Sequence, residues 1–462
     1  MAAWEYREIC EVDNVKKVKN RAFYTLVLVA AVIAGLGFYI VRYAVSGSKW
    51  ASAAFNPAVY SGGALKAGTL TDRSGVVLAD VTDGKRTFAN NADVRRSTLH
   101  VTGDKQGNIG TGALAVYAPE LMGYNIFTGA HSRTGEGKRI ALTIDSQLSV
   151  EAYKALNGRR GAVMVMNYET GEVLCMVSNP SFDPSNPPGN IDSDPRYEGV
   201  YLNRAISSAF TPGSTYKLLT AAASIECISD IYEREFVCEG ALKTEHGTVT
   251  CNRTHGKLTF EEALTVSCNS TFGELALELG ADKLAEYARK YGLSERTEVG
   301  GIKTAKGNFD KAAPDTADLA WSGVGQYNNA VCPAAMLRFV GAVANGGRAV
   351  EMNLLMKTGV SSFFSAGSTR IMRKDTARQL GEMMDYSVHQ KNVVRNFPGL
   401  ELHAKTGTAE VGGGKNSHAW FVGYITNEGY PLAFVVIVEN GGGGFAVASP
   451  IANRVLQAAI KG

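Results

Sequence analysis

The sequence lacks the usual signatures of a metal-binding or disulfide-built protein. Its seven cysteines form no C-x-x-C pair, no H-E-x-x-H stretch occurs, and cysteines and histidines form no tight cluster along the chain. We therefore expect no zinc site and no metal or cofactor of another kind. An odd number of cysteines in a chain of 462 residues also argues against a disulfide scaffold.

Other features that are weak or missing exclude further classes of protein. The net charge is only +3, which is too small for a nucleic-acid binder that depends on bulk charge. The 51 glycines follow no G-x-y period, so the chain is not collagen-like. No repeat of about 20–50 residues indicates a solenoid or propeller. With 45% apolar residues, the chain can bury a core, and its length suits two or three domains.

One long uncharged stretch lies near the N-terminus. Residues 22–41 read AFYTLVLVAAVIAGLGFYIV, which as a helix is about 30 Å long and matches the core of a bilayer. Four basic residues precede it closely: Lys16, Lys17, Lys19 and Arg21. The positive-inside rule then predicts a cytoplasmic tail over 1–21, a transmembrane helix over 22–41 and all later residues outside. A cleaved signal peptide is the alternative, but its apolar region would be shorter.

The remainder divides into two regions. Residues 42–138 predict a small β-rich module, with a strand, a turn and a second strand over 68–79. From residue 139 onward, two almost continuously apolar runs, 161–167 and 172–178, predict a hairpin in a sheet that is covered on both faces. Further helices are expected over 214–227, 260–290 and 451–460, and further strands over 420–426 and 432–439. This pattern predicts an α+β domain over 139–462 whose sheet joins remote segments.

The first chemical cluster is Ser214-Thr-Tyr-Lys217, which follows a Pro-Gly turn. A serine at the start of a helix faces free backbone N–H groups, and Lys217 lies on the same helical face as a base. The pKa of a lysine must fall by about 3.4 units, or roughly 4–5 kcal/mol, before its amine is neutral at pH 7. Burial together with a second cation could supply this. A simple N-cap is the alternative, and Ser46-Gly-Ser-Lys49 shows the same spacing beside the membrane.

Two further clusters follow along the chain. Ser267-Cys268-Asn269 offers a hydroxyl that can relay a proton and an amide that can hold a lysine and a substrate carbonyl; a polar turn between helices is the alternative. Lys405-Thr406-Gly407-Thr408 is predicted to form a strand edge to which an extended ligand could add. Lys405 would be the second cation. Lys357-Thr-Gly has the same letters, but no apolar hairpin follows it to hold it in a sheet.

Together and in this order, S-x-x-K, S-x-N and K-T-G are the motifs of penicillin-binding proteins and class A β-lactamases. The sequence resembles class B penicillin-binding proteins, the monofunctional D,D-transpeptidases of bacterial cell-wall synthesis. Short segments outside the three clusters carry the resemblance further: Leu142-Thr-Ile-Asp145, Asn179-Pro-Ser-Phe-Asp-Pro184, Gly325-Gln326 and Ala344-Asn-Gly-Gly347. The family often has glycine where this chain has Tyr327.

The resemblance implies a fold and a role for each residue. It implies a largely antiparallel five-stranded sheet between helical layers, preceded by the β-rich module as a pedestal. Ser214 would attack the penultimate D-Ala of a stem peptide with Lys217 as base, and Ser267, near Lys405, would pass a proton to the leaving D-Ala. Asn269, Thr406, Gly407 and Thr408 would bind and orient the substrate, and backbone N–H groups of Ser214 and Thr408 would form the oxyanion hole.

The resemblance also implies partners and leaves alternatives open. Stem peptides ending in D-Ala-D-Ala are the expected substrates and β-lactams the expected covalent inhibitors. Residues 42–138 are too few for a glycosyltransferase, so a SEDS-type membrane glycosyltransferase is the expected partner. No E-x-x-L-N stands between Asn269 and Lys405, which argues against a class A β-lactamase. A D,D-carboxypeptidase and a non-catalytic β-lactam sensor or scaffold remain as alternatives.

Three cysteines lie close to these motifs in the sequence. Cys238 and Cys251 bracket Gly240–Gly247, and they are either a hairpin disulfide or two free thiols. Cys268 stands inside the second cluster without a histidine or aspartate beside it, so we interpret it as a filler of the core and not as a nucleophile.

Overall fold

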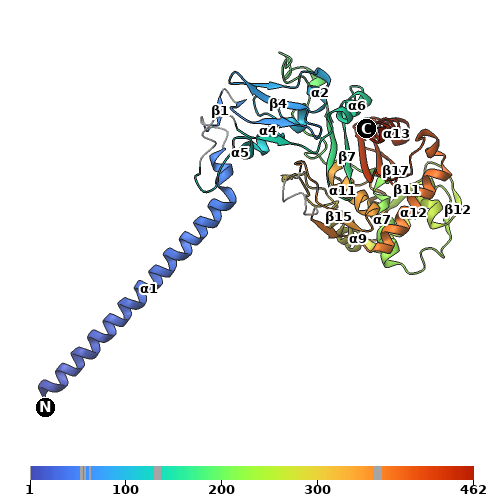
Figure 1. Ribbon diagram of the computed structural model, residues 1–462. Helices are drawn as coiled ribbons and strands as arrows, with labels where there is room; N and C mark the ends of the chain where they lie inside the picture. The colour runs from blue at the N-terminus through green and yellow to red at the C-terminus, as the bar shows by residue number, and fades with distance from the viewer. Residues whose placement is uncertain are drawn as a thin grey trace.

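The computed structural model describes residues 2–52, 56, 59–61, 64–129, 137–356 and 367–461. A long helix, α1 (Ala2–Ala51), projects away from two bodies that pack against each other (Figure 1). The body next to α1 is the small β module, and the larger body is an α+β domain that carries the C-terminus. The predicted order of helix, β module and α+β domain is therefore confirmed.

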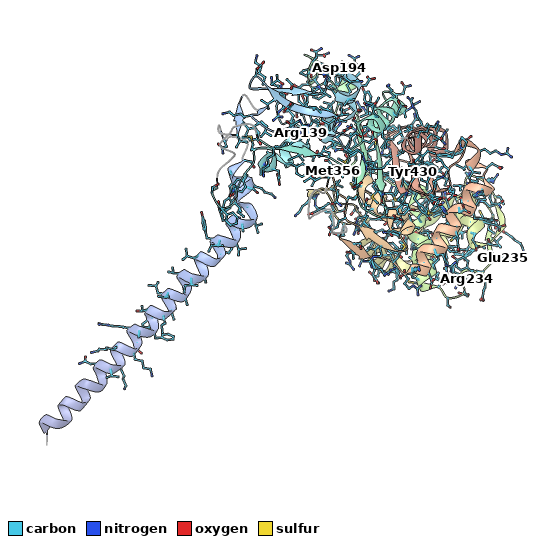
Figure 2. All side chains as sticks on the ribbon, viewed as in Figure 1. Arg139, Asp194, Arg234, Glu235, Met356 and Tyr430 are labelled. Carbon is cyan, nitrogen blue, oxygen red and sulfur yellow. The ribbon has the colours of Figure 1, made fainter. Side chains whose placement is uncertain are left out.

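Helix α1 contains the expected apolar segment 22–41 without interruption. The most apolar 18-residue window within Asn14–Ala51 has a mean hydropathy of 2.3 and buries nothing against the rest of the chain. Figure 2 shows the side chains along most of α1 standing clear of every other element. The helix is long and apolar enough to cross a membrane, a property that membrane anchors and signal sequences share.

The β module is built around a four-stranded sheet of order β5-β4-β3-β6. The expected strand–turn–strand is present as β3 (Thr69–Thr71) and β4 (Val77–Thr82). Strand β6 (Arg139–Ala141) pairs in parallel with β3, so the first strand after residue 138 completes this sheet. The other elements are β1 (Tyr60–Ser61), β2 (Ala64–Leu65), β5 (Lys85–Phe88), α2 (Ala92–Ser97), α3 (Leu99–Thr102), α4 (Ala113–Val116) and α5 (Ala118–Leu121).

Polar contacts tie the module to the α+β domain. The Arg95 guanidinium donates two hydrogen bonds to the Asp183 carboxylate, at 2.6 and 2.5 Å. Ser146 Oγ donates to Asp72 Oδ2 at 2.6 Å, and Tyr117 Oη donates to the carbonyl of Gly300 at 2.7 Å. Because these contacts join different parts of the two bodies, they resist both sliding and hinging of one against the other.

A five-stranded antiparallel sheet of order β17-β18-β19-β7-β8 forms the centre of the α+β domain. Its strands are β7 (Gly161–Asn167), β8 (Val173–Asn179), β17 (Leu402–Ala409), β18 (His418–Ile425) and β19 (Leu432–Val438). Both predicted hairpins are present, β7 with β8 and β18 with β19. The C-terminal pair of strands lies beside β7, so the sheet joins segments from the two ends of the domain, as expected.

Helices cover both faces of this sheet. Met164 and Met166 of β7 belong to one core cluster, which includes helix α11 (Pro333–Ala344), whereas Val163 and Val165 belong to a second. The second cluster also contains residues of α6 (Ser146–Leu156) and α13 (Gly444–Lys461). Successive side chains of a strand point to opposite faces, so a sheet buried on both sides requires an apolar run without alternation. The expectation from 161–178 is confirmed.

Elsewhere one prediction needs correction. Residues 260–290 do not form one helix: α8 (Phe260–Val266) ends at Ser267, and α9 (Asn269–Lys290) begins two residues later. Ser267 takes a left-handed conformation with φ 59°, which ends α8. Helical periodicity continues through both helices and does not reveal this break.

The remaining described helices are η1 (Pro195–Tyr197), η2 (Gly213–Thr215), α7 (Lys217–Cys227), α10 (Ala317–Val324), α12 (Lys374–Gln390) and η4 (Val393–Asn396). The remaining strands are β9 (Phe236–Cys238), β10 (Ala241–Thr244), β11 (Gly247–Thr250), β12 (Gly256–Leu258), β13 (Glu298–Val299), β14 (Ile302–Lys303), β15 (Arg348–Val350) and β16 (Ser368–Arg370).

Candidate active site

Ser214 lies in the 3-10 turn η2, and Lys217 is the first residue of the helix α7 that follows. The turn is built on Gly213, whose φ of +54° favours glycine and whose N–H donates to the carbonyl of Gly325 at 2.9 Å. Ser214 is half-buried, whereas Lys217 is buried completely. The turn thus places the hydroxyl at the surface of the domain and the amine beneath it.

The S-x-x-K turn packs directly against strand β17. A Cβ on Gly407 would lie 2.8 Å from Thr215 Cγ2 and 2.9 Å from the carbonyl oxygen of Pro212. Real Cβ atoms do not come so close, so only glycine lets the strand and the turn meet at this distance. Strand β17 pairs with β18 alone and is the edge of the sheet, as predicted for the K-T-G cluster.

The S-x-N cluster is the break between α8 and α9, and it holds Lys217. Lys217 Nζ donates hydrogen bonds to the carbonyl of Ser267 at 2.6 Å and to Asn269 Oδ1 at 2.7 Å, and it lies 3.2 Å from Ser267 Oγ. Asn269 Nδ2 in turn donates to the carbonyl of Thr250 at 2.8 Å. The left-handed Ser267 therefore turns its own carbonyl, its hydroxyl and the Asn269 amide toward the same amine.

Lys405 approaches Ser267 from the sheet. Its Nζ lies 3.1 Å from Ser267 Oγ and donates to the carbonyl of Thr406 at 3.0 Å, and the side chain is only 3% exposed. Three segments far apart in sequence thus bring two amines to one hydroxyl. The competing Lys357-Thr-Gly lies outside the described residues.

Burial governs the charge of both lysines. It lowers the pKa of Lys217 to about 7, against smaller opposing effects of Cys268 and Cys251, and the charge of Lys391 adds to the lowering. Burial, followed by the charges of Lys391 and Lys217, holds the pKa of Lys405 well below its usual range. A buried lysine whose pKa is near 7 and whose amine lies beside a hydroxyl can accept and donate protons. Sequence reasoning did not single out Lys391, because it stands in no motif.

These residues lie at and beneath one cleft. Its volume is about 790 Å³, and Ser214, Ser267, Asn269, Thr406 and Thr408 all line it. Lys217, Lys405 and Gly407 lie beneath this surface and complete the set of predicted site residues that the fold brings together. Several other lining residues stand in none of the three motifs, among them Thr250, Asn252, Asp318, Trp321 and Lys391.

One more contact crosses the cleft from the side of α10. The Gln326 side-chain amide makes two hydrogen bonds to the backbone of Glu410. Its nitrogen donates to the Glu410 carbonyl at 3.3 Å, and its oxygen accepts from the Glu410 N–H at 3.0 Å. The pair ties the segment after α10 to the end of β17. Tyr327 beside it has a φ of +62° and lines the cleft, 39% exposed. That left-handed backbone accounts physically for the glycine that the family often carries here.

The comparison with protein families gives one match that spans this site. Residues 161–457 match the penicillin binding protein transpeptidase domain. The chain belongs to this family. A curated relative is the peptidoglycan D,D-transpeptidase PbpA of Mycobacterium tuberculosis, 28% identical over 376 residues that cover 73% of this chain and 75% of the relative. The resemblance to class B penicillin-binding proteins is thereby confirmed.

Solved structures of penicillin-binding proteins agree with the fold. The crystal structure of PBPA from Mycobacterium tuberculosis has a TM-score of 0.73 and 25% identity, and the match covers 86% of this chain and 99% of that one. The ceftriaxone acyl-enzyme complex of penicillin-binding protein A from the same organism has a TM-score of 0.72 at 24% identity, with coverages of 85% and 98%. This penicillin-binding protein therefore has the predicted five-stranded transpeptidase fold.

Three cysteines lie together behind the S-x-N turn. Cys238 and Cys251 are free thiols whose Sγ atoms lie 3.6 Å apart, so of the two interpretations the structure has the unbonded one. Cys268 is buried in the core, as predicted. No tight cluster of cysteine and histidine occurs along the chain, but Cys238, Cys251, His255 and Cys268 converge in the fold. These four residues are spread over 31 positions of the chain, and β9, β11, β12 and the turn between α8 and α9 bring them together.

Proposed function

We propose that this penicillin-binding protein is a membrane-anchored peptidoglycan D,D-transpeptidase whose nucleophile is Ser214. One observation carries the assignment of the site: Lys217 Nζ and Lys405 Nζ both approach Ser267 Oγ, at 3.2 and 3.1 Å, beneath the cleft that Ser214 lines. Two crowded amines cannot both keep a proton at low cost, so one of them is available as a base.

In the acylation step Ser214 Oγ attacks the carbonyl of the penultimate D-Ala, and its proton passes to Lys217. A neutral Lys217 needs only two N–H groups for its two shortest contacts, to Ser267 O and Asn269 Oδ1, which leaves its lone pair free to accept. Backbone N–H groups of Ser214 and Thr408 would stabilise the oxyanion. Ser267, beside Lys405, then passes a proton to the departing amine as the peptide bond breaks and D-Ala leaves.

In the second step an amine from a neighbouring stem peptide attacks the Ser214 ester. Its proton returns to the serine oxygen through the same amines, and a new peptide crosslink is released. Strand β17 offers an unpaired edge on which an extended peptide could add, with Thr406 and Thr408 facing the cleft to orient it. A β-lactam would take the place of D-Ala-D-Ala and remain attached to Ser214.

The same proposal includes location and organisation. The basic residues before position 22 favour a cytoplasmic tail over 1–21, a retained transmembrane helix over 22–41, the module over 42–138 and the transpeptidase domain over 139–462 outside the membrane. The β module is too small to polymerise glycan. A SEDS-type membrane glycosyltransferase is therefore the proposed partner, and co-purification of the two full-length proteins in detergent tests it.

A labelling experiment tests the nucleophile. Purified full chain should form a long-lived adduct with fluorescent penicillin, and mass analysis of the peptides should locate it on Ser214. Ser214→Ala should abolish the adduct, whereas Ser46→Ala, in the competing S-x-x-K beside the membrane, should leave it intact. Rapid turnover of the drug, or an adduct on another residue, would contradict the proposal. With stem-peptide substrates, crosslinked products indicate transpeptidation, and products that have only lost D-Ala indicate a carboxypeptidase.

A further inference from the structure

The structure points to a metal site that no family resemblance supplies: we propose that Cys238, Cys251, His255 and Cys268 bind one Zn²⁺ ion directly behind the S-x-N turn. Their ligand atoms all lie within 4.8 Å of one another. Three cysteines and one histidine form a donor set that is common at structural zinc sites, and soft thiolate ligands favour zinc over calcium or magnesium.

The spacing of the ligand atoms fits a single ion. The Sγ atoms of Cys238 and Cys251 are 3.6 Å apart, those of Cys251 and Cys268 are 3.7 Å apart, and His255 Nδ1 lies 3.3 Å from Cys238 Sγ. A tetrahedral zinc with bonds of about 2.3 Å to sulfur and about 2.0 Å to nitrogen requires ligand separations of about 3.8 Å and about 3.5 Å. A disulfide would instead need its two sulfurs about 2.05 Å apart.

The surroundings of the sulfurs support metal-bound thiolates. The backbone N–H groups of Asn269 and Ser270 point at Cys251 Sγ, at 3.1 and 3.2 Å, and the N–H of Thr271 points at Cys268 Sγ at 3.5 Å. Such donors around a ligand orient it and stabilise its negative charge. The His255 imidazole faces Cys238 Sγ with Nδ1, and its Nε2 is buried without a hydrogen-bond partner among the described residues. Nδ1 is therefore the nitrogen that would bind the ion, and Nε2 would carry the ring proton.

Four separate pieces of chain provide the ligands. Cys238 ends β9, Cys251 follows β11, His255 precedes β12, and Cys268 lies between α8 and α9. The resulting pattern is C-x12-C-x3-H-x12-C, with a short C-x3-H at its centre. An ion bound by all four residues would fasten β9, β11 and β12 to the turn between α8 and α9. Binding would release the three thiol protons, as zinc sites in proteins generally do.

The position of Cys268 links the ion to catalysis. Cys268 stands between Ser267 and Asn269, the two residues that contact Lys217. Ser267 holds a left-handed backbone, which costs energy for a residue with a side chain and must be imposed by its surroundings. A zinc bond to the next residue would impose it. In this role the four ligands are positioning residues that act through Ser267 and Asn269, although Cys251 itself also lines the cleft.

The metal is tested first by its presence. Full chain purified with reductant should retain about one zinc per molecule by elemental analysis after gel filtration. Cys238→Ser and His255→Ala should lower the zinc content, whereas Cys227→Ser, an exposed cysteine outside the cluster, should not change it. Chelator-stripped wild type titrated with Co²⁺ should develop the visible bands of tetrahedral cobalt and a thiolate charge-transfer band, which makes the test independent of how the variants fold.

Several results would overturn the site. They are reduced protein that holds no zinc and gives no cobalt bands, a stable disulfide between any two of the three cysteines, or zinc that persists undiminished in both ligand variants. Zinc removal should also slow acylation by penicillin about tenfold or more and lower the melting temperature. An unchanged acylation rate in zinc-free protein would overturn the positioning role. Because zinc and cobalt are measured without substrate, failure of the proposed transpeptidase function would leave this test intact.

Discussion

Lys217 and Lys405 share one hydroxyl: their Nζ atoms lie 3.2 and 3.1 Å from Ser267 Oγ, although one lysine begins helix α7 and the other stands on edge strand β17. The charge of Lys217 adds to the burial and the Lys391 charge that lower the pKa of Lys405. Ser267 lies at the break between α8 and α9. Within the described part of the chain, its Oγ is the one atom within hydrogen-bonding distance of both amines. The catalytic hypothesis therefore depends on the relative placement of the helical layer and the sheet.

Replacing Lys405 tests which K-T-G cluster belongs to the site. Lys405→Ala removes the second amine from Ser267 and should slow acylation by fluorescent penicillin by about 10²–10³-fold. Lys357→Ala should leave the rate unchanged. Stopped labelling reactions followed over time on both variants give the rate constants. Equal losses in the two variants would show that the assignment of the K-T-G cluster is wrong.

Asn269 offers a test of how Lys217 is held. Asn269→Ala deletes the acceptor 2.7 Å from Lys217 Nζ and the donor to the carbonyl of Thr250. Loss of one positioning hydrogen bond should slow acylation about 10–100-fold, with the Ser214 adduct still forming at long times. Asn252→Ala, which also lines the cleft but stands outside the motifs, is the matched control. A larger loss in the control than in Asn269→Ala would refute the assigned role.

The acylation rate should depend on pH through Lys217. The pKa of about 7 means that the amine is protonated below this pH and cannot accept the serine proton, so the rate should rise as pH increases through about 7. The groups that act on this amine are Cys268 and Cys251, which oppose the lowering, and Lys391, which adds to it, with Lys405 across Ser267. Acylation rate constants measured from pH 5 to 9 check this. A rate that falls with rising pH in this range would contradict a lysine base.

Gly407 should tolerate no side chain. Its Cβ would meet Thr215 and the carbonyl of Pro212, so Gly407→Ala should push β17 from the S-x-x-K turn. Overpacking of this kind costs about 1–3 kcal/mol in stability, and acylation should fall further because Lys405 moves with the strand. Gly189→Ala, at an open position, is the control. Thermal melting and penicillin labelling measure both effects, and a fully active Gly407→Ala would show that close contact is dispensable.

Arg95 should contribute to stability without acting in catalysis. Its guanidinium and the Asp183 carboxylate are mostly buried, with side-chain exposures of 16% and 10%, and Arg95 lowers the pKa of Asp183 by its hydrogen bonds. Arg95→Ala leaves this mostly buried carboxylate without its cation, which should lower the free energy of unfolding by about 2–4 kcal/mol. Denaturant unfolding measures the loss. Arg378→Ala removes a pair with Glu382 in which the side chains are 57% and 63% exposed, and should change stability little. Equal losses in the two variants would contradict the role of the junction.

Much of the local structure could be predicted from residue patterns. The uncharged segment inside α1 and the two apolar hairpins follow from interactions between neighbours in sequence. The break at Ser267 entered from the sequence only as one alternative, a polar turn between helices. Apolar periodicity continues on both sides of it, and the left-handed backbone of Ser267 is visible only in the fold. The cysteine cluster was missed for the same reason, because its ligands come from four elements.

The sequence by itself determined which residues are available for chemistry, their order along the chain and the length and apolar character of the uncharged segment in α1. Those properties depend on residue type and short-range spacing, which the chain carries whether or not it folds. Only the tertiary structure decided that burial lowers the pKa of Lys217 to about 7, that Lys391 acts on it, and that three cysteines and a histidine meet behind Ser267. Burial and the distance between charges are set by how the helical layer packs on the sheet, and no local pattern contains that information.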